Sequence, residues 1–119
     1  MNPKWQKLSI ELEELLDTML NFHNVTKRRM FSSQAYFANG NMFVGVFEDT
    51  IFLRLSEKDR ELIKDQYNDI EHFEPLEGKK MREYLVITEQ IFGNIQEFEK
   101  WLDKSYQYAS KIPPKKRKK

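Results

Sequence analysis

The sequence predicts an α+β fold in which N- and C-terminal helices pack against an antiparallel sheet of about four strands. Three observations support this prediction. Each end of the chain has the apolar spacing of an amphipathic helix, an Asn-Gly pair separates two strand-like runs, and the length of 119 residues is typical of one domain. We assign residues 1–110 to that domain and residues 111–119 to a disordered basic tail, which is too charged to fold alone.

The first predicted element is an amphipathic helix at the N-terminus. Pro3 suits its first turn, where a missing N–H removes no intrahelical hydrogen bond. The helix is expected to end near residues 22–25. Its apolar stripe recurs at steps of three and four residues: Trp5, Leu8, Leu12, Leu15, Leu16 and Met19.

An antiparallel meander of three strands is predicted next. Asn39-Gly40 favours the positive φ angles of a two-residue type I′ turn, which places strands at 33–38 and 41–47. Glu48-Asp49 forms a second tight turn, and a third strand follows over 51–55. A short helix then begins, capped by Ser56.

The rest of the domain is predicted to contain one more strand and one long helix. Residues 68–78 are interpreted as irregular because they contain Pro75 and Gly78. The segment 81–87 fits a fourth strand. Asn94 is the expected N-cap of the last helix, which ends before two consecutive prolines.

Composition argues against several classes of function. The chain has no cysteine, which rules out disulfides, thiolate metal sites and cysteine nucleophiles, and it has only two histidines. Its four glycines match no nucleotide-binding fingerprint, and nothing places two carboxylates in one pocket. Glu71-His72-x-Glu74 offers metal-ligand types, but a surface histidine is the preferred interpretation. We assign no catalytic residue, metal or cofactor and predict a non-enzymatic protein. The minor alternative is an enzyme or small-molecule binder whose site lies between the sheet and the helices.

The net charge of +1 conceals an asymmetry along the chain. Residues 111–119 hold six Lys or Arg and no acid, so the remaining residues carry a net charge of −5. This basic end is similar to a nuclear-localisation signal, and it would equally serve as a nonspecific nucleic-acid arm or a solvated end. Its candidate nucleic-acid contacts are Lys115, Lys116, Arg117, Lys118 and Lys119.

Four cations of the domain are candidate contacts for a partner. Lys27, Arg28 and Arg29 stand together before the first predicted strand, where they could bind phosphates or a carboxylate-rich partner, or instead pair with the acidic body. Arg54 is a charge on an otherwise apolar strand and therefore needs a partner or an exposed face. The strand aromatics are assigned to the core in preference to a base-stacking surface: Tyr36, Phe37, Phe43, Phe47 and Phe52.

The expected location of the protein is the cytoplasm. The first ten residues lack the apolar segment of a secretory signal, and no apolar run approaches the length of a membrane span. We therefore expect no membrane partner. The sequence does not decide whether the protein forms a homodimer through an exposed strand edge.

Several short motifs, in their order and spacing, resemble the N-terminal domain of the TfoX/Sxy family. The resemblance covers about residues 10–119, although Ser32 and Ser33 stand where the family usually has glycines. The motifs are Arg28-Arg29-Met30-Phe31, Asn39-Gly40-Asn41-Met42-Phe43, Phe52-Leu53-Arg54-Leu55-Ser56, Phe73-x-Pro75, Gly78-x-x-Met81-x-x-Tyr84 and Trp101-Leu102 followed by Tyr108-Ala109.

The resemblance implies an α+β fold with a central antiparallel sheet and a regulatory or adaptor role through protein contact. Two-domain members are similar to regulators of DNA-uptake competence that work with a cyclic-AMP-responsive transcription factor, so a partner in the transcription machinery is expected. Nucleic-acid association through the tail is the alternative. The family motif supplies no catalytic residue, and these matching residues are expected to be structural: Met30, Phe31, Gly40, Met42, Phe43, Pro75, Tyr84 and Trp101.

Overall fold

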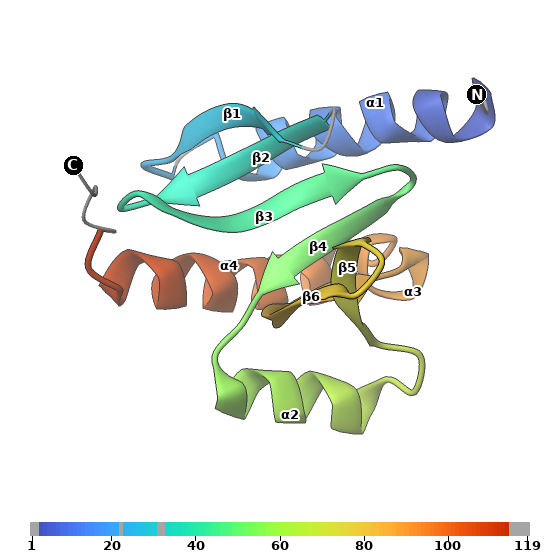
Figure 1. The fold of residues 1–119 in the computed structure, drawn as a ribbon. Coiled ribbons are helices and arrows are strands. Elements are labelled where there is room, and N and C mark those ends of the chain that lie inside the picture. The colour runs from blue at the N-terminus through green and yellow to red at the C-terminus, as the bar shows by residue number, and fades with distance from the viewer. Residues whose placement is uncertain (1–2, 22, 31–32, 115–119) are drawn as a thin grey trace.

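The structure is a computed structural model that describes residues 3–21, 23–30 and 33–114, with side chains from residue 8 onward (Figure 1). Phe31, Ser32, the side chain of Trp5 and the five tail cations at 115–119 lie outside the described residues. The helices are α1 (Pro3–Met19), α2 (Glu57–Gln66), α3 (Glu89–Phe92) and α4 (Ile95–Lys111). The strands are β1 (Thr26–Met30), β2 (Ser33–Ala38), β3 (Asn41–Phe47), β4 (Thr50–Arg54), β5 (Glu71–Leu76) and β6 (Lys79–Ile87).

All six strands form one antiparallel sheet in the order β1-β2-β3-β4-β6-β5. The α+β class and the antiparallel sheet are confirmed, and so is the meander, now β2, β3 and β4. The expectation of about four strands is wrong. The two additional strands, β1 and β5, are the two edges of the sheet.

The edge strands lack the alternation that marks a strand in a sequence. The cations of β1 are exposed, so no apolar residue alternates with them. In β5, which was interpreted as irregular, Phe73 is the one buried residue, and the register shifts on both sides of it. Pro75 fits there because an edge strand has a free side, where its missing N–H breaks no ladder.

The Asn39-Gly40 turn between β2 and β3 is confirmed. Asn39 has φ 52° and Gly40 has φ 79°, as a type I′ turn requires. The caps of two helices are confirmed as well. The Ser56 side chain accepts from the N–H of Asp59 at 3.2 Å, and Asn94 accepts from the N–H of Glu97 at 3.3 Å.

The main core lies on one face of the sheet, and all four helices contribute to it. In Figure 1, α4 passes behind β4 and α1 behind β2. Leu16 of α1 and Trp101 of α4 are fully or almost fully buried against strand residues such as Val44 and Leu85. Helix α1 is also held by polar contacts, because the Tyr36 hydroxyl donates to Asp17. None of the described helices is long and apolar enough to cross a membrane.

Candidate functional site

The opposite face of the sheet carries a second apolar cluster that is built from strand residues alone. Phe52 of β4 stacks on Phe73 of β5, with ring centroids 4.1 Å apart and planes 6° apart, and Phe47 meets Phe73 edge-on. The buried members are Ala35, Met42, Phe52, Phe73 and Tyr84. Since no helix contributes to this cluster, we call this side the helix-free face.

An open groove of about 730 Å³ lies on the helix-free face. It holds three of the five methionines of the chain, and among the described residues that line it the charged ones are two arginines and no acid. The lining residues are Arg28, Met30, Phe37, Gly40, Asn41, Met42, Arg54, Met81, Tyr84 and Pro114. We call this the methionine groove.

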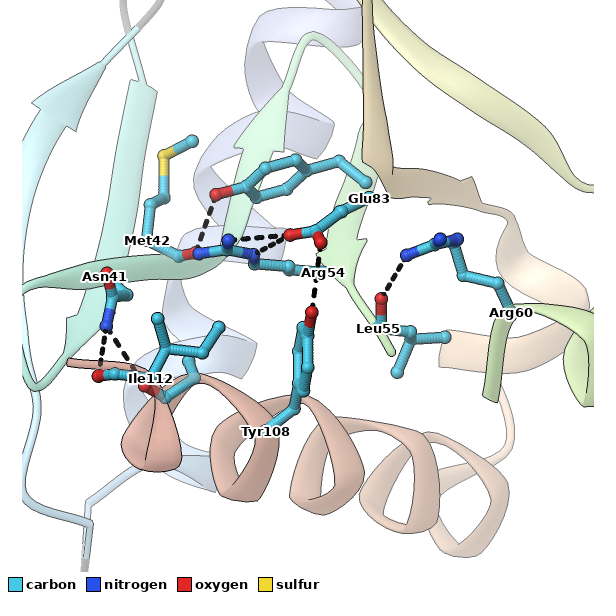
Figure 2. A network of polar contacts seen from close by, with 10 residues as sticks. Asn41, Met42, Arg54, Leu55, Arg60, Glu83, Tyr108 and Ile112 are labelled. Carbon is cyan, nitrogen blue, oxygen red and sulfur yellow. Dashed lines mark hydrogen bonds and ion pairs between the residues drawn. The ribbon is translucent and has the colours of Figure 1, made fainter. Parts of the chain in front are cut away.

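Arg54 is held in place by Glu83 of the neighbouring strand β6. Its Nε and Nη2 lie 2.7 and 2.6 Å from Glu83 Oε1, and the Tyr108 hydroxyl of α4 donates to Glu83 Oε2 at 3.0 Å (Figure 2). The guanidinium also lies over the rings of Tyr84 and Tyr108, at 5.5 and 5.7 Å from their centroids. The partner that sequence reasoning required for Arg54 is therefore Glu83.

The electrostatics of Glu83 follow from these contacts. Burial opposes ionisation of its carboxyl group, but the hydrogen bonds from Arg54 and Tyr108 outweigh burial and lower the pKa of Glu83 below its usual value. The wall of the groove beside it is fixed by Tyr84, whose hydroxyl donates to the carbonyl of Met42 at 2.8 Å. Arg54 thus reaches the groove as a fixed cation.

The structure separates the three cations of β1. Arg28 lines the methionine groove, with its guanidinium 5.1 Å from the centroid of the Phe37 ring. Lys27 instead pairs with Asp17 of α1 at 3.1 Å, and both side chains are about half exposed. Arg29 alternates with Arg28 along the strand. Of the four predicted contact cations, the structure brings Arg28 and Arg54 to one surface.

The C-terminal end of α4 is held at one end of this groove. Asn41 Nδ2 donates to the carbonyls of Ala109 and Ile112 at 3.2 and 2.9 Å, and Asn39 Nδ2 donates to Ile112 at 2.9 Å. Gly40 adjoins Pro114, since a Cβ at Gly40 would lie 3.5 Å from Pro114 Cβ. The five cations at 115–119 follow this anchored residue directly in the sequence.

Replacing Asn41 with alanine should destabilise the protein by about 1 kcal/mol. The amide is buried and satisfies the last carbonyls of α4, which would have to find water in its place. Equilibrium unfolding in urea measures the loss. Asn68→Ala, at an exposed position, is the matched control and should change stability by less than about 0.5 kcal/mol. Equal stability of the two variants would contradict the anchoring role.

The remaining residues that match the family motif are divided between the two faces. Phe43 and Trp101 are buried in the main core, and Met42 and Tyr84 in the second cluster. Pro75 lies on the edge strand β5. Sequence reasoning did not select Glu83, Tyr108 or Asn41 as site residues, and their local signal is only that each is a polar residue directly before a buried one.

The groove offers apolar contact and guanidinium donors to a bound molecule. Within the described part of the chain, no group of three or more His, Asp or Glu side chains is arranged to hold a metal ion. Arg28 is exposed and is suited to receive a carboxylate next to an apolar side chain, whereas the guanidinium of Arg54 already pairs with Glu83.

Comparison with known proteins places the chain in a family. No curated protein matches it significantly. The family model described as the TfoX N-terminal domain matches residues 16–109, a range that runs from the second half of α1 to the last turn of α4. The match therefore includes the whole sheet and the lining residues of the methionine groove except Pro114. The chain belongs to the TfoX N-terminal domain family.

Proposed function

We propose that this protein is a non-enzymatic regulatory or adaptor domain that acts by protein contact, and that the methionine groove is its contact surface. The observation that carries the proposal is the composition of the groove: three methionines, two aromatic residues and two arginines, with no acid among the described residues that line it. The occupant we infer is a short partner segment with apolar side chains and a carboxylate. By family resemblance, the partner belongs to the transcription machinery.

Each lining residue type favours such an occupant. Methionine is flexible and polarizable, so Met30, Met42 and Met81 can adapt to apolar side chains of different shapes. Arginine is enriched among the residues that dominate binding energy at interfaces. Arg54 is already held by Glu83, so its side chain loses little conformational entropy when a partner packs against it.

The basic tail supports an acidic occupant as well. Its five cations follow Pro114, which lines the groove. Clustered positive charge accelerates the encounter with an acidic partner and does so more strongly at low salt. The groove and the tail therefore both favour a negatively charged partner, although the chain outside the tail carries a net charge of −5.

A peptide-library selection against the full chain tests this proposal. We expect the enriched peptides to combine acidic and large apolar residues. The substitution Arg28→Glu should weaken their binding at least about tenfold, because it removes an attraction and adds a repulsion worth about 1.4 kcal/mol together. Fluorescence anisotropy with labelled peptides measures the dissociation constants.

The matched control is Lys58→Glu. Lys58 is an exposed cation on α2 that does not line the groove, and reversing it makes the same change in net charge. Binding should fall less than about threefold in this variant. Enriched peptides without acidic residues, or equal weakening by the two substitutions, would count against the groove.

A further inference from the structure

A second surface of the protein gathers basic side chains from α2, β5 and β6. They surround an open depression of about 460 Å³ that shares no lining residue with the methionine groove. The five basic residues are Arg60, Lys64, His72, Lys80 and Arg82. Because they come from separate elements, the fold rather than the local sequence brings them together.

The acids that line the depression offset only part of its positive charge. Among the described residues, Arg60, Lys64, Lys80 and Arg82 form no ion pair. Glu57 and Glu61 also line the depression, which leaves an excess of two positive charges with His72 neutral. This excess stands out in a chain that is acidic outside its tail.

Arg60 is positioned by the strand that precedes α2. Its Nη1 donates to the carbonyl of Leu55 at 2.6 Å, and Figure 2 shows the side chain extended toward that carbonyl. This bond uses one of the five N–H donors of the guanidinium. A fixed arginine beside mobile lysine ammonium groups is a common way to bind phosphate.

The pKa of His72 is sensitive to the cations that surround the depression. Burial lowers the pKa of His72, and the charges of Lys64, Lys80, Arg60 and Arg82 lower it further. All four cations line the same depression as His72. An anion bound there would stabilise the imidazolium form and raise the pKa of His72 again.

We propose that this depression binds phosphate groups, either those of a nucleic-acid backbone or those of a free polyphosphate. Arginine and lysine supply charge-assisted hydrogen bonds to phosphate oxygens, and an open depression admits a chain that continues past the site. Such contacts recognise the backbone and carry no sequence information. The proposal is independent of the methionine groove, so the two can fail separately.

The first measurement is the pKa of both histidines by NMR on the full chain with the five tail cations changed to glutamine. One sample contains tripolyphosphate, a second contains a short DNA duplex, and a third has no ligand. We expect the pKa of His72 to rise with at least one ligand, whereas His23, which does not line the depression, stays unchanged. A rise with the duplex alone identifies a nucleic-acid backbone, and a rise with tripolyphosphate identifies a site for free phosphates. An unchanged His72 in both samples overturns the proposal.

The second measurement is affinity, in the same tail-neutral background. K80Q/R82Q removes two cations of the depression, and K58Q/K111Q removes two exposed lysines outside it. With the ligand that shifts His72, we expect weaker binding for K80Q/R82Q only. For the duplex, the slope of log affinity against log salt should fall by about two. Equal behaviour of the two variants overturns the proposal.

Discussion

Replacing Gly45 with valine is expected to lower the free energy of unfolding by about 3 kcal/mol. Gly45 lies in the middle of β3 on the helix-free face. A Cβ there would lie 2.4 Å from Phe52 Cζ and 3.1 Å from the Cβ of Ala35. Phe52 cannot retreat easily, because it is fully buried and stacked on Phe73. Valine adds further methyl groups to this overlap.

Equilibrium unfolding in urea, followed by fluorescence, measures this loss. Phe52→Leu provides the matched test, because leucine shortens the side chain that the new Cβ meets. We expect the double variant Gly45→Val/Phe52→Leu to lose less unfolding free energy than the sum of the two single losses, by at least about 1 kcal/mol. If the two losses are strictly additive, the clash between the new side chain at position 45 and Phe52 is not what destabilises the Gly45→Val variant.

Replacing Glu83 with alanine should cost about 2 kcal/mol near neutral pH. Arg54 would lose its ion pair although its side chain is only 18% exposed, and Tyr108 would lose its acceptor. The loss is smaller than for a fully buried pair because solvent reaches Glu83, whose side chain is 38% exposed. Glu99→Ala, at an exposed position of α4, is the control and should be nearly neutral.

The Glu83 contribution also has a defined pH dependence. The folded state lowers the pKa of Glu83 below its usual 4.5, so this stabilisation is present above pH 4.5 and is lost as the pH falls through the lowered value. The stabilities of the wild type and of Glu83→Ala should therefore converge as the pH falls below 4.5 and through the lowered pKa. A constant gap between them from neutral to acid pH would contradict the ionic role of Glu83.

The elements with local signals were predicted well from the sequence. Asn39-Gly40 specifies its turn through two adjacent positive φ angles, and Ser56 and Asn94 specify helix starts through a single side chain. The edge strands β1 and β5 carry no such signal. An edge strand pairs on one side only, so exposed cations and a proline are compatible with it.

The candidate site could be predicted only in part. Arg28 and Arg54 were selected because they are charges beside apolar segments, but their common surface depends on how the sheet brings β1 next to β2 and β4 next to β6. The pairing of Arg54 with Glu83 and Tyr108 joins three distant segments. Nothing in local spacing specifies contacts of this kind.

Charge averages were also a poor guide to the surface. The chain outside the tail is acidic as a whole, yet α2, β5 and β6 gather a positive depression around His72. Some of its cations stand next to acids along the sequence, such as Arg60 between Asp59 and Glu61 and Arg82 before Glu83. Only the tertiary fold brings the cations of α2 and β6 together around His72.

The most direct test of the methionine groove as the docking surface is the methyl NMR spectrum of the methionines. Met30, Met42 and Met81 line the groove, whereas Met19 packs against the main core and serves as an internal reference. When the tightest peptide from the selection is added, we predict that the three groove methyl signals shift and that the Met19 signal does not. Saturated peptide binding that leaves all three groove signals unchanged would contradict the proposed docking surface.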